Sequence, residues 1–448
     1  MKKYFLLALV FILTISNIST AFAGYDKLTP IVLKADEEAP EISAESAILI
    51  NADSGDIIYQ KQSNKKQYPA SITKLMTVLL ALENADPSDI MTFSRNAVFS
   101  IERNSNHIAI DVDERLSVMD GLHAIMLVSA NEVSNGIAEH ISGSMEEFAK
   151  LMTKRAEELG CKNTSFKNAN GLHEEDHYTT AYDMALIAKE LLKYDLFKEL
   201  ATTTYYEIEP TNIQSEKRYL HMQNKMVMPS SNYYYEYCIG GKTGFTDQAL
   251  NTLVTYAQKD GMTLICVVLK ENGAANTYKD SITLFDYGFN NYTSVPLFTA
   301  SGYETTVKTE AINPDTNEPI SVSLKANSDF IATVPKDTNI SSIQKKFSCP
   351  EVISSATAGE AIGEISFMYN DLKLGSVDLV AQASVRSGNG LVSERSISFV
   401  KIMIIAVIFA VIGFGVFLAY VFIRREIMYQ RRKRRRRQRM QALRNQNR

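Results

Sequence analysis

A serine and a lysine stand three residues apart in Ser71-Ile-Thr-Lys74, where an apolar stretch without strand breakers begins. That stretch predicts a buried helix, and side chains at this spacing share one helix face. The first turn of a helix favours an alkoxide or an oxyanion, and a partly desolvated lysine has a lowered pKa and can accept a proton. The pair therefore suits a nucleophile and its base, although solvated residues on an ordinary helix face give the same spacing.

Two further tripeptides could complete such a site. Ser129-Ala-Asn131 follows an apolar run, and Lys242-Thr243-Gly244 follows two glycines and opens a strand region. A second serine and an asparagine can shuttle protons and orient an amide, whereas Lys242 and Thr243 offer a charge and a donor to a carboxylate. Gly244 would let the backbone approach a ligand closely. Each tripeptide is uninformative alone, but all three in this order are rare by chance.

With these motifs the chain resembles the low-molecular-weight penicillin-binding proteins that have D-alanyl-D-alanine carboxypeptidase activity. The resemblance extends over residues 44–292 and more loosely beyond, and it includes Tyr68–Thr77, Met126–Asn131, Asn163–Asn168, Tyr178–Asp183, Lys242–Thr246 and Asp286–Phe289. It implies an α+β fold of the penicillin-binding and serine β-lactamase type, with an antiparallel sheet and a helical subdomain. It also implies peptidoglycan stem peptides as substrates, β-lactams as covalent inhibitors, and no cofactor or metal.

The resemblance assigns a role to each matching residue. Ser71 would attack the carbonyl between two D-alanines and form an acyl ester, with Lys74 as the general base. Ser129 would relay protons, and Asn131 would hold the substrate or Lys74. Binding of the substrate and its oxyanion would fall to Lys242, Thr243, Gly244 and the backbone N–H groups of Ser71 and Phe245.

Three positions depart from the family's usual pattern. Leu250 stands where a glycine is common, Thr277 where an arginine often lies, and Glu132 where an aspartate is favoured. A missing arginine weakens capture of the substrate carboxylate. These differences bear on substrate affinity and turnover, whereas the set needed for acylation is complete.

The elements that must position these residues follow from the hydrophobic pattern. Apolar runs on both sides of Asp53-Ser-Gly-Asp56 predict a β-hairpin. Helices are expected at 71–83, 118–141, 145–159 and 181–192, and strands at 253–257 and 264–269. This order predicts an α+β domain whose sheet joins its first and last strands. Short alternating strands from 295 to 383 predict a small all-β domain.

Both ends of the chain indicate export and anchoring. Two lysines, a short apolar run and Ala21-Phe-Ala23 are typical of a secretory signal peptide, with an uncleaved anchor as the alternative. Residues 402–423 carry no charge and as a helix would extend about 33 Å, enough to span a bilayer. Because basic clusters mark the cytoplasmic side, the following Arg-rich tail predicts a single-pass protein in the cell membrane whose catalytic domain lies outside.

The expected organisation follows from these segments. It comprises a signal peptide at 1–23, a lead-in segment at 24–43, a catalytic domain at 44–294, a β-domain at 295–383, a linker at 384–400, a transmembrane helix at 401–423 and a basic cytoplasmic tail at 424–448.

Composition limits the alternatives. The chain has 448 residues, 45% hydrophobic and 22% charged, which excludes fibrous and broadly disordered classes. Residues 424–448 carry twelve Lys or Arg and one Glu, so the net charge of -4 conceals an acidic body. The basic tail beside a membrane span favours lipid attraction over nucleic acid. Four scattered cysteines are too few for a disulfide framework or a zinc site, although the sequence leaves undecided whether two of them form one disulfide.

Other functions fit the sequence less well. A class A β-lactamase needs a Glu-x-x-Leu-Asn string, and none lies between Asn131 and Lys242. An inactive wall-binding or β-lactam-sensing receptor, with the β-domain as its working part, stays open as an alternative. The six histidines show no glycine-framed nucleophile partner. A metal site is only a minor hypothesis, with His173, Glu174, Asp176 and His177 as its ligands.

Overall fold

The structure is a computed structural model that describes residues 28–31, 33–313, 316–386 and 390–391. The expected signal peptide at 1–23, membrane span at 401–423 and basic tail at 424–448 lie outside the described residues. Within the described ranges, no helix is both long and apolar enough to cross a membrane. All four cysteines are free thiols.

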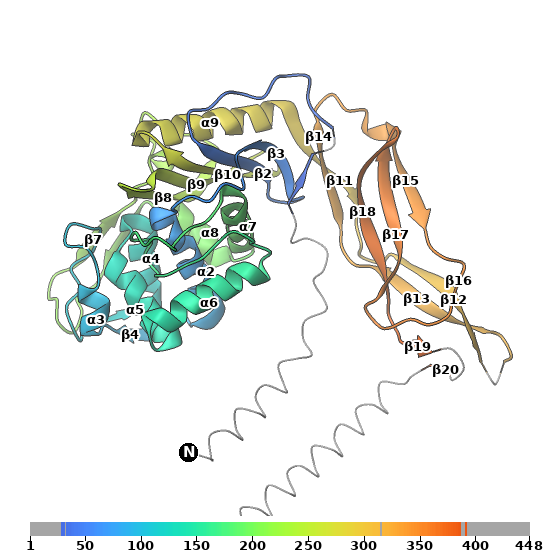
Figure 1. Cartoon of the computed structure of the whole chain (residues 1–448), viewed down its shortest axis with the longest axis horizontal. Helices are drawn as coiled ribbons and strands as arrows, with labels where there is room; N and C mark the ends of the chain where they lie inside the picture. The colour runs from blue at the N-terminus through green and yellow to red at the C-terminus, as the bar shows by residue number, and fades with distance from the viewer. Residues whose placement is uncertain (1–27, 32, 314–315, 387–389, 392–448) are drawn as a thin grey trace, which may run out of the picture. The chain divides into compact units, whose positions relative to one another are not determined.

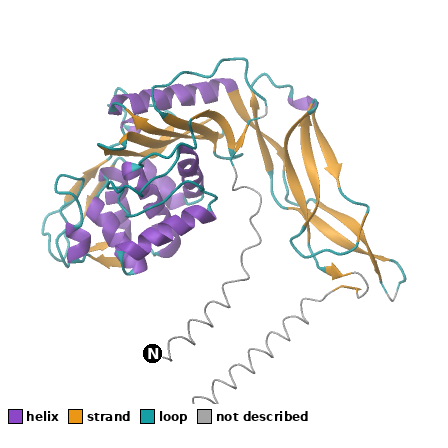
Figure 2. Ribbon diagram, in the orientation of Figure 1, coloured by secondary structure: helices purple, strands orange, loops and turns teal. Residues whose placement is uncertain are grey.

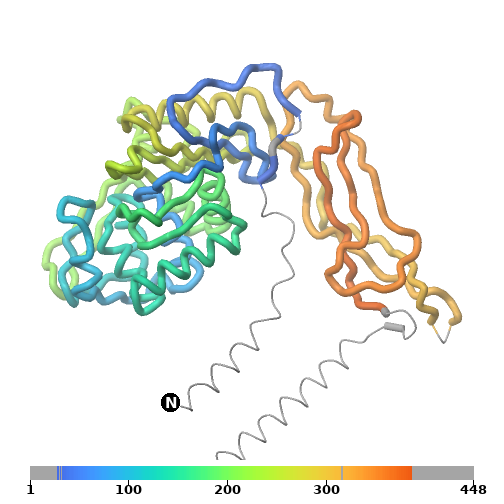
Figure 3. Tube along the Cα trace, in the orientation of Figure 1, coloured from blue at the N-terminus to red at the C-terminus, as the bar shows by residue number. Residues whose placement is uncertain are grey.

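A six-stranded sheet forms the centre of the first part of the chain, in the order β1-β3-β2-β10-β9-β8. Its strands are β1 (Thr29–Pro30), β2 (Ser46–Asn51), β3 (Asp56–Lys61), β8 (Cys238–Thr246), β9 (Leu250–Lys259) and β10 (Met262–Glu271). β2 and β10 pair antiparallel, although they are about as far apart in the chain as this region allows (Figure 3). The predicted hairpin and the pairing of first and last strands are thus confirmed.

Helices cover both faces of this sheet (Figures 1 and 2). One face carries α2 (Lys74–Asn84), α4 (Val118–Val128), α5 (Asn131–Ser142), α6 (Met145–Glu158), α7 (Ala181–Leu191) and α8 (Asp195–Thr202), with the short α3 (Arg95–Phe99) at the periphery. The other face carries α9 (Ala274–Asn291). The mixed α and β composition predicted for this region is confirmed.

Apolar side chains on both faces of the strands explain why helices cover both faces of the sheet. On β2, Ile48 and Ile50 belong to the core shared with the helical layer, whereas Ala47 and Leu49 belong to the core under α9. β10 divides its side chains in the same way, because successive residues of a strand point to opposite faces. Strands buried on both faces read as nearly continuous apolar runs.

Short elements surround the helical layer. They are η1 (Ala70–Thr73), η2 (Lys225–Val227) and two small antiparallel pairs, β4 (Ile90–Thr92) with β5 (Arg115–Ser117) and β6 (Tyr205–Ile208) with β7 (Arg218–His221). The last pair forms a hairpin whose tip, residues 209–217, lies against the segment before β5.

The chain after α9 is rich in strands, as predicted. These are β11 (Tyr292–Phe298), β12 (Glu304–Ile312), β13 (Pro319–Ala326), β14 (Phe330–Pro335), β15 (Ile343–Ser348), β16 (Val352–Ile353), β17 (Ala361–Tyr369), β18 (Leu372–Ala381), β19 (Val385–Arg386) and β20 (Gly390–Leu391), with η3 (Ile340–Ser342). β11 pairs with β14, and β17 pairs with both β15 and β18, all antiparallel, whereas β12 and β16 run parallel.

Two compact units divide the described residues. The first continues to Thr305 and includes 325–349 and 361–380, and the second contains 306–324, 350–360 and the described residues from Ala381 onward. Within the first unit, the Asn51 side chain donates to Ser294 Oγ at 2.7 Å and to Thr333 Oγ1 at 2.9 Å. These hydrogen bonds join the end of β2 to β11 and β14.

Candidate active site

Ser71 lies in the 3₁₀ turn η1, directly before α2 begins at Lys74. The sequence pattern predicts an α-helix from Ser71. The α-helix instead begins three residues later, at Lys74, and Ser71 lies in the tighter 3₁₀ turn before it. Strand β9 holds the start of this turn, because Thr252 Oγ1 donates to the carbonyl of Pro69 at 2.9 Å. The Ser71 side chain is only half-buried, which leaves its hydroxyl accessible to a ligand.

The Lys74 amine is fully buried and contacts three acceptors. Its Nζ donates to Ser71 Oγ at 3.0 Å, to Asn131 Oδ1 at 2.7 Å and to the carbonyl oxygen of Asn170 at 2.5 Å. Burial lowers the pKa of Lys74 well below its usual value, and the nearby Lys242 lowers it further, whereas Glu132 raises it. A neutral amine next to the Ser71 hydroxyl can accept its proton.

Ser129 and Asn131 lie at a break between α4 and α5. The apolar pattern predicts one helix over 118–141, and this prediction is wrong, because Ser129 takes a left-handed φ of 63° and ends α4. The break turns α5 so that Asn131 reaches Lys74. Ser129 Oγ is buried and has no hydrogen-bond partner among the described residues, so it is available to a substrate or a water.

Strand β8 passes close to Ser71 and carries the third motif. A Cβ on Gly244 would lie 2.8 Å from the backbone N of Ser71 and 2.5 Å from Thr252 Oγ1, so only glycine allows this approach. The next residue, Phe245, is 58% exposed, and Thr243 is half-buried. Lys242 is 2% exposed, and burial lowers its pKa to about 7. The structure thus brings all three motifs together.

The segment between α6 and α7 also contributes to the site, and the motif analysis did not single out its contacts. Besides the carbonyl of Asn170, the carbonyl of Ala169 accepts from Thr77 Oγ1 at 2.6 Å. Gly171 has φ +86, and a Cβ there would lie 2.0 Å from the carbonyl oxygen of Ala70. Every residue has a backbone carbonyl, so the sequence does not show which carbonyls reach the site. A glycine next to them, such as Gly171, does indicate that two backbone segments approach closely.

His177 supports the site from within the core. Its Nδ1 accepts from the backbone N–H of Lys167 at 3.2 Å, so Nε2 carries the proton that it shares with Thr73 Oγ1 at 2.8 Å. Burial lowers the pKa of His177 to about 3, which keeps the ring neutral. Both ring nitrogens are therefore occupied. No group of three His, Cys, Asp or Glu side chains within the described ranges could hold a metal ion, so nothing there favours the hypothesis of a metal site at His173 and His177.

Comparisons with known proteins agree with this geometry. The profile of the D-alanyl-D-alanine carboxypeptidase family, Peptidase_S11, matches residues 33–273. The chain belongs to this family. It is 36% identical to the D-alanyl-D-alanine carboxypeptidase DacF of Bacillus subtilis (strain 168) over 337 residues, which cover 74% of this chain and 83% of that protein. It is also 30% identical to DacA of Haemophilus influenzae over 356 residues, 76% of this chain and 84% of that protein.

A solved structure supports the same assignment. Penicillin-binding protein 5 from Haemophilus influenzae superposes with a TM-score of 0.67 at 25% identity, and the match covers 78% of this chain and 100% of that one. The chain is thus a serine D-alanyl-D-alanine carboxypeptidase with the fold of penicillin-binding proteins.

The structure shows the conformation or contacts of the three residues that depart from the family's usual pattern. Leu250 takes φ 55°, in the left-handed region that favours glycine, at the turn between β8 and β9. Thr277 is 3% exposed and donates to the carbonyl of Ala274 in its own helix at 2.7 Å, so it contributes no charge. Glu132 is buried, and its Oε1 accepts from the backbone N–H of Ile108 at 2.7 Å.

We predict that Gly171→Ala slows acylation of Ser71 by about tenfold or more, because the new Cβ displaces the turn that carries the nucleophile, and small misplacements cost large factors in rate. The rate of labelling by a fluorescent penicillin measures this. Gly143→Ala is the control, because Gly143 has a similar φ of +76 but no atom within 4 Å of the new Cβ. Equal labelling rates in both variants would contradict the prediction.

Proposed function

We propose that this carboxypeptidase removes the terminal D-alanine of peptidoglycan stem pentapeptides through an acyl-enzyme on Ser71. The observation that carries the proposal is the buried Lys74 amine, 3.0 Å from Ser71 Oγ and held by Asn131 and Asn170. None of its three hydrogen-bond acceptors is charged, and although the nearby Glu132 favours the protonated amine, burial and Lys242 outweigh it and leave the pKa lowered. It is placed and tuned as a general base.

Acylation would follow from this geometry. Lys74 accepts the Ser71 proton while Oγ attacks the carbonyl carbon between the two D-alanines. The carbonyl oxygen becomes an oxyanion, which the backbone N–H groups of Ser71 and Phe245 stabilise across the close approach at Gly244. Collapse breaks the C–N bond, and Ser129, whose hydroxyl has no hydrogen-bond partner among the described residues, passes its proton to the leaving amine and takes up the proton that Lys74 had accepted, so both residues return to their starting forms. D-alanine departs, and the ester remains on Ser71.

Deacylation restores the enzyme. Water adds to the ester carbonyl and Lys74 accepts one of its protons. Lys74 then returns this proton to Ser71 Oγ, which leaves as the alcohol, and the shortened peptide is released as an acid that loses its remaining proton to solvent. A β-lactam would enter the same path because its strained amide occupies the place of the scissile bond. Its ring-opened acyl group has no small leaving amine to depart, which favours a long-lived ester.

We expect Ser71→Ala to abolish both release of D-alanine from a stem pentapeptide and covalent labelling by a fluorescent penicillin, since the variant lacks the attacking oxygen. Mass spectrometry of the protein and of the peptide reads both events. Ser100→Ala, at an exposed serine, serves as the control and should behave as the unmodified chain does. Labelling without peptide turnover in the unmodified chain would instead favour a β-lactam receptor, and rapid release of hydrolysed penicillin would favour a β-lactamase.

The substrate carboxylate should give the enzyme a pH dependence through Lys242. Burial lowers the pKa of Lys242 to about 7, so this amine is charged below that pH and neutral above it. We therefore expect KM for the pentapeptide to rise as the pH increases through neutrality. In Lys242→Arg the charge persists at all these pH values, and the inflection should vanish. A KM of the unmodified enzyme that is flat across neutral pH would contradict this role.

We propose further that the catalytic domain works outside the cell membrane, with the chain cleaved after Ala23 and anchored by residues 401–423. The small-residue pattern before Gly24 and the uncharged segment followed by an Arg-rich tail support this. In cell fractionation, the full chain should sediment with membranes and a chain ending at Ser398 should not. Protease added to intact spheroplasts should digest the catalytic domain, and its protection there would contradict the proposed topology.

A further inference from the structure

Helix α5, which carries Asn131, begins without a side-chain cap of its own. Its N-cap residue is Ala130, which has no side-chain oxygen to accept from the first-turn N–H groups. Residues 106–114, here called the capping segment, replace it. The carbonyl of Asn106 accepts from the backbone N–H of Asn131 at 2.9 Å, and the N–H of Ile108 donates to Glu132 Oε1 at 2.7 Å. The start of α5 therefore depends on a segment distant in sequence.

The capping segment has no regular structure to hold it in place. It lies outside helices and strands, and two of its residues, Ala109 and Asp113, adopt left-handed φ values of 56° and 65°. Non-glycine residues persist in that region only where surrounding contacts over-determine the backbone. Contacts from elsewhere in the chain must therefore hold the segment in shape.

Arg218, the first residue of β7, supplies the central contacts. Its Nε donates to the carbonyl of Ile108 at 2.8 Å and its Nη2 to the carbonyl of Ala109 at 2.9 Å. The same guanidinium makes a two-point bond to Glu114, with N–O distances of 2.8 and 3.0 Å. The Glu114 side chain is fully buried and that of Arg218 is 10% exposed, so little water competes with this pair.

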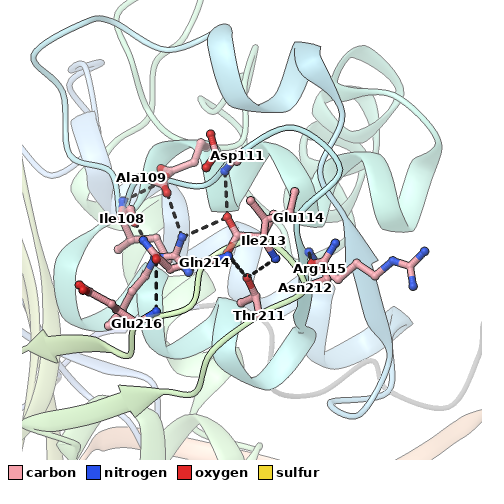
Figure 4. A network of polar contacts seen from close by, with 12 residues as sticks. Ile108, Ala109, Asp111, Glu114, Arg115, Thr211, Asn212, Ile213, Gln214 and Glu216 are labelled. Atoms are coloured by element: carbon pink, nitrogen blue, oxygen red, sulfur yellow. Dashed lines mark hydrogen bonds and ion pairs between the residues drawn. The ribbon is translucent and has the colours of Figure 1, made fainter.

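The hairpin tip between β6 and β7 adds a second set of contacts around Glu114 (Figure 4). Thr211 Oγ1 donates to Glu114 Oε1 at 2.7 Å, and the Asn212 side chain donates to the carbonyl of Asp113 at 2.9 Å and accepts from the N–H of Arg115 at 2.8 Å. Burial raises the pKa of Glu114, but the bonds from Arg218 and its other donors outweigh this and leave the pKa lowered. The ion pair thus persists at neutral pH.

We propose that Arg218 is a positioning residue for acylation, because by holding the capping segment it fixes the start of α5 and so places Asn131 against Lys74. The path is short. Arg218 binds the carbonyl of Ile108, the N–H of Ile108 binds Glu132, and the adjacent Asn131 contacts Lys74 Nζ at 2.7 Å. The inference rests on the proposed roles of Ser71 and Lys74.

The test is Arg218→Lys, which keeps the positive charge but cannot reproduce the four hydrogen bonds of the guanidinium. Stopped-flow labelling with a fluorescent penicillin separates the limiting acylation rate from the dissociation constant of the non-covalent complex. We expect the limiting rate to fall by about tenfold, since Asn131 no longer holds the Lys74 amine in place. The dissociation constant should change by less than about twofold, because β8 is untouched.

Arg155→Lys is the matched control. Arg155 on α6 also makes a two-point bond to a carboxylate, Glu83, with Nε 3.1 Å from Oε2 and Nη2 2.8 Å from Oε1, and its side chain is 22% exposed. Among the described residues, the Arg155 side chain makes its hydrogen bonds and ion pairs with Glu83, Glu158 and Glu190 and none with residues 106–114. Glu83 lies at the end of α2 opposite to Lys74. Both variants should lower Tm. Destabilisation alone reduces the fraction of molecules that label, whereas the proposed role reduces the rate constant of those that do.

An unchanged limiting rate in the folded fraction of Arg218→Lys would overturn the proposal, and so would an equal slowing in Arg155→Lys. If Arg218→Lys does not fold, Asn212→Ala replaces it, because at an exposed hairpin tip it removes one bond to Asp113 in the capping segment and one to Arg115, the residue directly after it. A slowed limiting rate in that variant supports the proposal, and an unchanged rate counts against it. Persistent labelling of Ser71→Ala would instead contradict the proposed function.

Discussion

The buried amine of Lys74 is the constraint on which the site depends. A lysine shielded from water is costly to keep charged, and the protein surrounds this one with neutral acceptors rather than a carboxylate. The consequence is a pKa lowered well below the ordinary value in an amine 3.0 Å from Ser71 Oγ, the pair that we propose as base and nucleophile. Each acceptor comes from a different part of the chain, so η1, the start of α5 and the loop after α6 must all be placed before the base is formed.

The sheet provides the frame for that placement. Its strands are apolar on both faces, which fixes a helical layer on one side and α9 on the other. β8 is the edge strand of the sheet, so its outer side is left open to a ligand beside Ser71. Glycine at position 244 lets this edge reach the backbone of the nucleophile. The nucleophile and base that we propose therefore lie beside an open strand edge.

The polar contacts around the helical layer serve a different purpose from its apolar core. Packing decides where α4 and α5 lie, but the break at Ser129 leaves the N–H groups in the first turn of α5 in need of acceptors. Arg218 and Glu114 meet that need indirectly, through a segment that has no regular structure. The Arg218–Glu114 ion pair thereby links the β6–β7 hairpin to the capping segment, which in turn contacts the start of α5.

By itself the sequence determined the family, the identity of the motif residues and the alternation of strand, helical and strand regions, because these depend on local spacing, hydrophobic period and chemical type. Ser71, Lys74, Asn131 and Gly244 could all be named in this way. Only the tertiary structure decided that Ser129 interrupts a continuous apolar pattern, that the carbonyl of Asn170 binds Lys74, and that Arg218 supports α5. The physical reason is that these contacts join distant residues and often use backbone atoms, which every residue carries alike.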